Sequence, residues 1–156
     1  MTRPTRLEVD LGALRHNVSY ALKSAKPSKV MAVVKANAYG HGLIRILPAL
    51  SEADALALLE IDGAILLRNS GYKKPIILLE GFFGSSELSI FSQKSLTPVI
   101  HHYEQIKILI SAKLKKPITV FLKFNSGMNR LGLNLKRFDE AYQALATSQN
   151  VRSVVA

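Results

Sequence analysis

The sequence contains no cysteine. This absence excludes disulfides, thiolate metal sites and a cysteine nucleophile, and it fits a reducing compartment. Long apolar runs are also missing, because Val30–Val34 and Ile76–Leu79 are each followed by charge, Gly or Pro well before the roughly 18 residues of a membrane span. The basic amino terminus is not followed by the apolar stretch of a secretory signal. We therefore expect a cytoplasmic protein without a transmembrane helix.

Acidic residues are scarce, since 11 Asp and Glu stand against 21 Lys and Arg and leave a formal charge of +10 on 156 residues. Such a surplus raises the possibility of nucleic-acid binding. The cations are scattered, however, and the densest cluster, Lys113, Lys115 and Lys116, precedes Pro117 where a loop is expected. No aromatic residues alternate with basic ones to form a base-stacking surface. We expect no nucleic-acid partner, and a salt-dependent DNA-binding assay would test this.

Short apolar runs alternate with amphipathic helical segments along the whole chain. Strands are expected at about 5–9, 30–34, 55–58, 76–79, 98–100 and 118–122, with another beginning at 151. Helices are expected from an Asp10 cap, at 42–50 and 61–69, from a cap at Ser85 or Ser86 to 94, at 102–111, and from an Asn134 cap. Apolar strands that alternate with helices predict an α/β protein with a parallel sheet.

Periodicity alone does not separate a TIM barrel from a doubly wound sheet. The pattern amounts to about five βα units and the start of a sixth strand, and an eight-stranded barrel would need about three more units. We therefore expect residues 1–156 to be the amino-terminal part of a longer protein, with any carboxy-terminal domain outside this chain.

The stretch MAVVKANAYGHG (31–42) is the first that predicts chemistry. Lys35 stands where a buried strand ends, and a Gly-containing turn follows. In a barrel such a lysine points into the carboxyl-terminal mouth, where desolvation favours the neutral amine that attacks aldehydes. By position alone, a lysine that extends to solvent explains Lys35 better, but packing does not account for Tyr39, Gly40, His41 and Gly42 at this spacing.

The stretch KFNSGMNRLG (123–132) repeats the arrangement after the strand at 118–122. Lys123 ends the strand, and a Gly-containing turn leads to Arg130, whose planar guanidinium suits a carboxylate or a cofactor oxygen. In a parallel barrel the carboxyl ends of the first and fifth strands face one mouth, so Lys35, Lys123 and Arg130 are predicted to share a pocket. The alternative interpretation is that Lys123 and Arg130 are two exposed cations on a surface loop and line no pocket.

Together these motifs resemble the amino-terminal barrel of bacterial alanine racemases, which are pyridoxal-phosphate (PLP) enzymes of fold type III. The resemblance covers nearly the whole chain and includes three further stretches, ALRHN (13–17), KPIILLEGFF (74–83) and QNVRSVV (149–155). It implies a (β/α)8 barrel, interconversion of L- and D-alanine that supplies D-alanine for peptidoglycan, and a homodimer.

The resemblance also assigns roles. Lys35 would hold PLP as an internal aldimine and act as one of two acid/base groups, on the D-face of the substrate. Tyr39 would bind the cofactor phosphate, Leu79 would pack beside its ring and Arg130 would bond its phenolic oxygen. Arg130 and the Met128 backbone would lie near the substrate carboxylate, and Lys123 matches a position that is commonly carbamylated.

Three histidines are interpreted as structural residues rather than as ligands or catalytic groups. His41 is interpreted as a packed or turn-forming residue. His101 and His102 show no metal-ligand spacing with nearby carboxylates, so no metal site is expected.

The chain departs from the family pattern at two places. Asn125 and Ser126 replace the usual Asp-Thr pair, and residues 60–63 (EIDG) replace a segment that commonly has an arginine, a leucine and paired glutamates. The resemblance places the second catalytic group, a tyrosine, in a carboxy-terminal domain of the partner subunit.

Two alternatives to an active racemase therefore remain, namely a non-catalytic PLP-binding protein and an inactive truncated remnant. Related racemases of serine, lysine or broader specificity share these motifs. Residues 1–156 alone are expected to be inactive.

Overall fold

The sheet of this protein contains six parallel strands that follow one another in sequence order. The structure, a computed structural model, describes residue 4 and residues 6–156. The strands are β1 (Met31–Val33), β2 (Ala55–Leu58), β3 (Ile76–Leu78), β4 (Leu96–Ile100), β5 (Ile118–Leu122) and β6 (Val151–Val155). A doubly wound sheet reverses its strand order at a switch point. This sheet does not, so the fold is of the barrel type, as expected.

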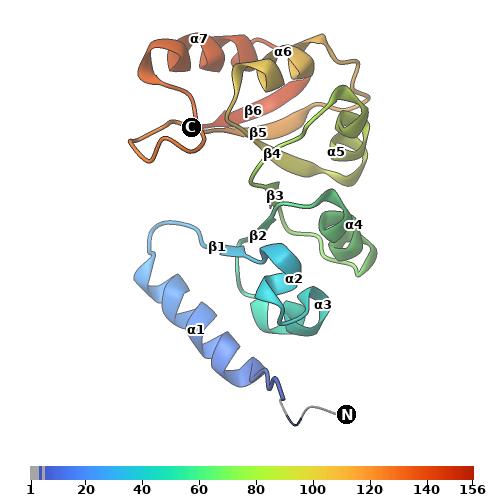
Figure 1. Ribbon diagram of the computed structural model, residues 1–156, viewed down its shortest axis with the longest axis vertical. Coiled ribbons are helices and arrows are strands. Elements are labelled where there is room, and N and C mark those ends of the chain that lie inside the picture. The colour runs from blue at the N-terminus through green and yellow to red at the C-terminus, as the bar shows by residue number, and fades with distance from the viewer. Residues whose placement is uncertain (1–3, 5) are drawn as a thin grey trace.

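Helical segments connect the strands and follow the sheet in an arc (Figure 1). They are α1 (Leu11–Ser24), α2 (Lys35–Tyr39), α3 (Leu43–Ile46), α4 (Ile61–Asn69), α5 (Leu88–Lys94), α6 (Tyr103–Ser111) and α7 (Leu135–Ala146), with the 3-10 turns η1 (Leu47–Leu50) and η2 (Ser85–Glu87). Helix α1 packs against η1 rather than across the sheet.

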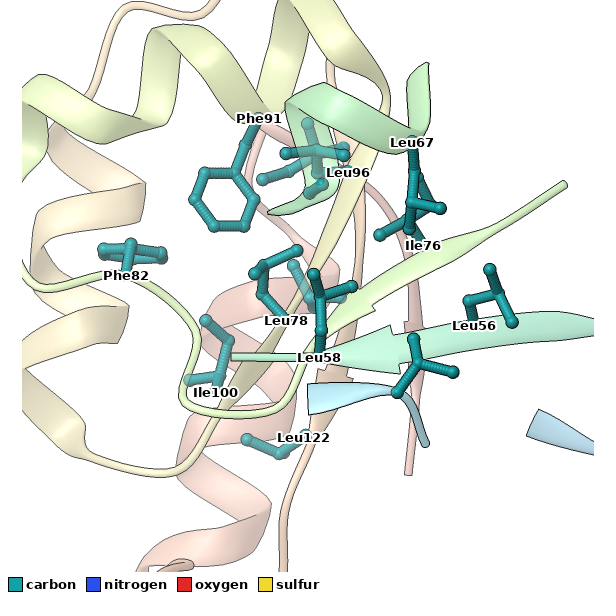
Figure 2. Packing of buried hydrophobic residues seen from close by; sticks show 14 of the residues in the cluster. Leu56, Leu58, Leu67, Ile76, Leu78, Phe82, Phe91, Leu96, Ile100 and Leu122 are labelled. Carbon is teal, nitrogen blue, oxygen red and sulfur yellow. The ribbon is translucent and has the colours of Figure 1, made fainter. Parts of the chain in front are cut away.

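Side-chain alternation divides the strand residues between two faces of the sheet. Leu56 and Leu58 of β2 lie in the core between sheet and helices, where Figure 2 shows Leu58 beside Leu78. Ala55 and Ala57 of the same strand belong to a second, smaller cluster on the opposite face. Because successive side chains of a strand point to opposite faces, the larger cluster is the layer under the helices and the smaller one is the inner face of the barrel.

The inner face is built from small and β-branched side chains. Its buried members are Ala55, Ala57, Ile77 and Val99, with Leu79 and Phe121 partly buried beside them. The helix-covered face instead holds bulky groups such as Phe82 and Phe91, whose rings meet edge to face at 6.0 Å. Stability is therefore concentrated under the helices.

Helix boundaries follow from local capping. The Asp10 carboxylate accepts from the Gly12 and Ala13 N–H groups at 2.7 and 3.0 Å, so the predicted cap of α1 is confirmed. The Asn134 cap of α7 is confirmed by its bond from the Arg137 N–H at 3.3 Å. The predicted cap at Ser85 or Ser86 is wrong, because Gly84 precedes η2 without a side-chain cap.

Beyond one or two residues at element ends, three further predicted elements differ in extent or kind. Residues 6–9 form no strand, whereas residue 5 of that predicted strand lies outside the described residues. The helix predicted for 42–50 is α3 followed by η1, because Pro48 at the start of η1 cannot donate the α-helical bond. Strand β4 begins at Leu96 instead of Pro98 and pairs with β3 from Ile76 onward.

Candidate active site

Three of the predicted site residues lie just beyond the carboxyl ends of their strands. Lys35, Leu79 and Lys123 follow β1, β3 and β5, and Leu79 packs against the inner-face cluster. All three are half-buried. Carboxyl ends of parallel strands form the functional rim of a barrel, so the sheet places these side chains on one rim.

The turn that begins at Lys35 is left-handed. Ala36, Asn37, Ala38 and Tyr39 have φ values of 50°, 51°, 56° and 55°, and Gly40 follows at 86°. A left-handed turn costs L-residues about 1–2 kcal/mol each, because Cβ crowds the following carbonyl oxygen. Four such non-glycine residues in a row are a strained segment of the kind that concentrates at functional sites.

Hydrogen bonds hold this strained turn closed. The Ala38 and Gly40 N–H groups donate to the carbonyls of Val34 and Ala36 at 2.9 and 3.0 Å. The Asn37 side chain accepts from the Leu43 N–H at 2.8 Å and ties the turn to α3. The turn buries Ala38 and leaves Tyr39 59% exposed at the rim.

His41 also belongs to this turn. Its Nδ1 donates to the Ala38 carbonyl at 2.8 Å, and its backbone N–H donates to the same oxygen at 3.0 Å. The interpretation of His41 as a turn-forming residue is therefore confirmed.

The second turn, residues 123–133, is closed by backbone contacts at its base. Leu133 donates to the Lys123 carbonyl and accepts from the Asn125 N–H, both at 2.9 Å. Gly132 has a φ of 116°, and a Cβ there would lie 2.8 Å from the Asn125 nitrogen. Only glycine fits at this crossing of two backbone segments.

Asn125 replaces a residue that is acidic in the family pattern, and its contacts explain how the turn tolerates an amide. Its Oδ1 accepts from the Gly127 and Asn129 N–H groups at 3.1 and 3.0 Å, as a carboxylate would. Its Nδ2 donates to the Asn129 Oδ1 at 2.8 Å, a bond that a carboxylate does not make. The turn presents Met128, 77% exposed, and Arg130, also exposed, to solvent.

Four polar side chains at these turns make no such bonds within the described residues and are free to take a ligand. Among residues 4 and 6–156, no side-chain hydrogen bond or ion pair engages Lys35, Tyr39, Lys123 or Arg130. A cavity of about 540 Å³ beside α1 is lined by Tyr39 and not by Lys35, Lys123 or Arg130. That cavity is therefore not the predicted common pocket. The two lysines follow strands that are separated in the sheet by β2, β3 and β4.

Sequence reasoning missed Gln105, which fastens the rim beside Leu79. Its buried side chain donates to the Glu80 and Phe82 carbonyls at 3.0 and 3.1 Å, and it accepts from the His101 and His102 N–H groups at 3.0 and 3.3 Å. All four hydrogen-bonding positions of the amide are used. The only signal in the sequence is a glutamine at the third position of a helix, where capping boxes occur.

Gly81 makes that fastening possible. A Cβ at this position would lie 2.6 Å from the Val99 carbonyl oxygen and 2.7 Å from the Gln105 Nε2. The loop after β3 therefore lies directly on β4 and α6, and this close approach positions Leu79 at the rim.

The two neighbouring histidines have structural partners. His101 Nε2 lies 3.0 Å from the Glu80 carbonyl, and the His102 side chain caps α6. Across the described residues, no group of three or more His, Cys, Asp or Glu side chains is placed to hold a metal ion. In the same part of the chain, no helix has both the length and the apolar character to cross a membrane.

Comparison with known proteins identifies the family. The sequence model of "Alanine racemase, N-terminal domain" matches residues 9–156, so the chain belongs to the alanine racemase family through this domain. Alanine racemase of Erwinia tasmaniensis is 47% identical over 151 residues, and catabolic alanine racemase of Klebsiella aerogenes is 48% identical over 151 residues. Each match covers 97% of this chain and 42% of the relative, so the chain spans less than half the length of these relatives.

Solved structures agree with this assignment. Biosynthetic alanine racemase of Pseudomonas aeruginosa superimposes with a TM-score of 0.89 at 38% identity, over 94% of this chain and 41% of that one. Alanine racemase of Acinetobacter baumannii gives a TM-score of 0.85 at 33% identity, over 94% and 42%. The six-stranded sheet therefore has the fold of the barrel in these alanine racemases, of which it matches 41–42%.

Proposed function

We propose that the protein containing this chain interconverts L- and D-alanine with PLP and so supplies D-alanine for peptidoglycan. The observation that carries this proposal is the pair of lysine-ended strands, β1 and β5, whose turns present Tyr39 and Arg130 at one rim of a family barrel. A non-catalytic PLP-binding protein is not favoured, because relatives nearly half identical to this chain are named alanine racemases. The same names favour alanine over serine as the substrate.

The residues at the rim fit PLP by their chemistry. An amine, a phenol hydroxyl and a guanidinium, from Lys35, Tyr39 and Arg130, are the groups that an aldehyde, a phosphate and a phenolic oxygen require. Leu79, half-buried on the inner face, offers an apolar surface to a ring. When bound, PLP withdraws electrons from the bonds at the substrate α-carbon.

The chain's own residues would bind and orient the reactants. Lys35 would hold the cofactor and then move a proton at the α-carbon on the D-face. Arg130 and the Met128 backbone would orient the substrate carboxylate, while a carbamylated Lys123 would orient Arg130 through an ion pair.

Lys35 as the attachment point is tested by borohydride reduction of the PLP-loaded protein, followed by peptide mapping. Reduction turns a lysine–cofactor linkage into a stable secondary amine. We expect the label on the peptide containing Lys35, and we expect it to vanish in Lys35→Arg but not in Lys123→Arg. Label on Lys123 or on scattered surface lysines would refute the assignment.

A polypeptide of residues 1–156 made on its own is expected to racemise alanine poorly. Racemisation needs a second proton-transfer group on the face opposite Lys35, which the family resemblance places on the partner subunit of a homodimer. Loss of one acid/base group costs about 10²- to 10⁴-fold in rate. A coupled D-alanine oxidase assay would measure this, and activity close to that of a full-length racemase would show that a residue of this chain supplies the second group.

We also propose a cytoplasmic location, with which the absence of cysteine is compatible.

A further inference from the structure

A second cavity, which has polar walls, lies at the opposite end of the sheet from the candidate active site. It encloses about 220 Å³ between the segments that precede β3, β4 and β5 and the start of β6. Four of its lining residues are cationic, namely Arg68, Lys73, Lys116 and Arg152, and no Asp or Glu lines it. The amino-terminal ends of the strands form this rim, so the cavity is separate from the turns at Lys35 and Lys123.

Among the described residues, the four cations of this cavity form no ion pair. The ion pair found there is Lys107–Glu104, and neither residue lines the cavity. Arg68 is half-buried and the other three cations are exposed, so the four like charges repel one another through a partly aqueous medium that screens them. An anion in the cavity would remove that repulsion.

Arg68 is held in place by the backbone around it. Its guanidinium donates to the carbonyls of Lys94, Tyr72, Lys74 and Ser95 at 2.8–2.9 Å. An arginine side chain has five N–H donors, so one on Nη2 remains. Burial lowers the pKa of Arg68 below its ordinary value, because desolvation disfavours the charged guanidinium.

Arg152 is placed by an irregularity of the sheet. Ile118 pairs with Val151 and Thr119 with Ser153, which leaves Arg152 as the extra residue of a bulge. Bulges redirect a side chain relative to regular pairing. Arg152 lines the cavity together with Thr97 and Thr119, and the Thr119 hydroxyl is already hydrogen-bonded to the Ser153 hydroxyl at 3.0 Å.

We propose that this cavity binds a small oxyanion, either inorganic phosphate or the phosphate group of a small metabolite. Its volume is below the roughly 300–1,000 Å³ of pockets for larger ligands, which favours a single tetrahedral anion. Arginine and lysine side chains around such an anion form charge-assisted hydrogen bonds. The proposal does not depend on the racemase activity.

The test is phosphate binding to the full-length protein saturated with PLP, so that the cofactor phosphate site is already filled. Thermal unfolding and calorimetry are compared in sodium phosphate and in sodium chloride of equal ionic strength. We expect phosphate to raise the melting temperature by about 2 °C or more. We also expect Arg152→Gln and Lys116→Gln each to weaken binding at least about tenfold.

Lys113→Gln is the matched control, because Lys113 is an exposed cation of the same loop as Lys116 that does not line the cavity. If Arg152→Gln does not fold, Lys73→Gln replaces it. A parallel titration with glycerol phosphate separates the two sources of anion, since tighter binding than inorganic phosphate identifies a phosphate ester as the ligand. No binding of either compound, or equal weakening in Lys113→Gln, would overturn the proposal.

Discussion

The two turns that follow lysine-ended strands reach the same rim by different physical means. The turn at Lys35 adopts left-handed backbone over four non-glycine residues and is held by the hydrogen bonds of its own backbone and of Asn37. The turn at Lys123 is a wider loop closed by Leu133, Asn125 and a glycine with no room for a side chain. The first turn therefore stores conformational strain in its backbone. The second turn instead requires two backbone segments to lie in contact at Gly132.

The largest difference should appear when one glycine of each turn is replaced by alanine. Both Gly132 and Gly40 have positive φ, but a Cβ at Gly132 meets backbone at 2.8 Å whereas a Cβ at Gly40 meets nothing within 4 Å. We expect Gly132→Ala to cost about 3 kcal/mol of stability and Gly40→Ala about 1 kcal/mol. Denaturant unfolding of both variants measures this, and equal losses would show that close approach is not what distinguishes the turns.

The role of strain in the first turn is tested at Asn37. Asn37→Ala removes the bond to the Leu43 N–H and also places a residue poorly suited to left-handed backbone, for an expected loss of about 2 kcal/mol. Asn37→Gly removes the same bond without the conformational cost, so its loss should be about 1 kcal/mol. If the two variants unfold alike, the left-handed conformation carries no measurable penalty.

The smallest expected effect lies outside both turns, at the start of α1. Hydrogen bonds from the Ala13 and Gly12 N–H groups lower the pKa of Asp10 below its ordinary 3.8. A lowered pKa in the folded state means that the cap stabilises above pH 3.8 and that this contribution is lost as the pH falls through the folded value.

Asp10→Asn keeps a capping side chain that does not titrate. Melting temperatures from pH 6 to pH 2 should therefore decline slightly less steeply in Asp10→Asn than in the parent protein. An identical decline in both would show that Asp10 contributes nothing to the acid sensitivity.

Much of the site's placement could be predicted because it depends on short-range pattern. Strands β2 and β5 begin and end where their apolar runs do, and helix α4 has the predicted bounds. Once these strands are parallel neighbours in sequence order, Lys35 and Lys123 must emerge at the same rim. The catalytic and binding roles of Lys35, Tyr39, Leu79, Lys123, Met128 and Arg130 remain predictions.

The sequence by itself determined the α/β class, the family and the two lysine motifs, because alternation and local spacing express them directly. Only the tertiary structure decided how the rim is built. The left-handed backbone after Lys35 contradicts the local preference of alanine and is kept by bonds to Val34 and Leu43. Gln105 and Gly81 matter because segments more than 20 residues apart meet there. Such contacts depend on which loops the sheet brings together, and no local pattern records that.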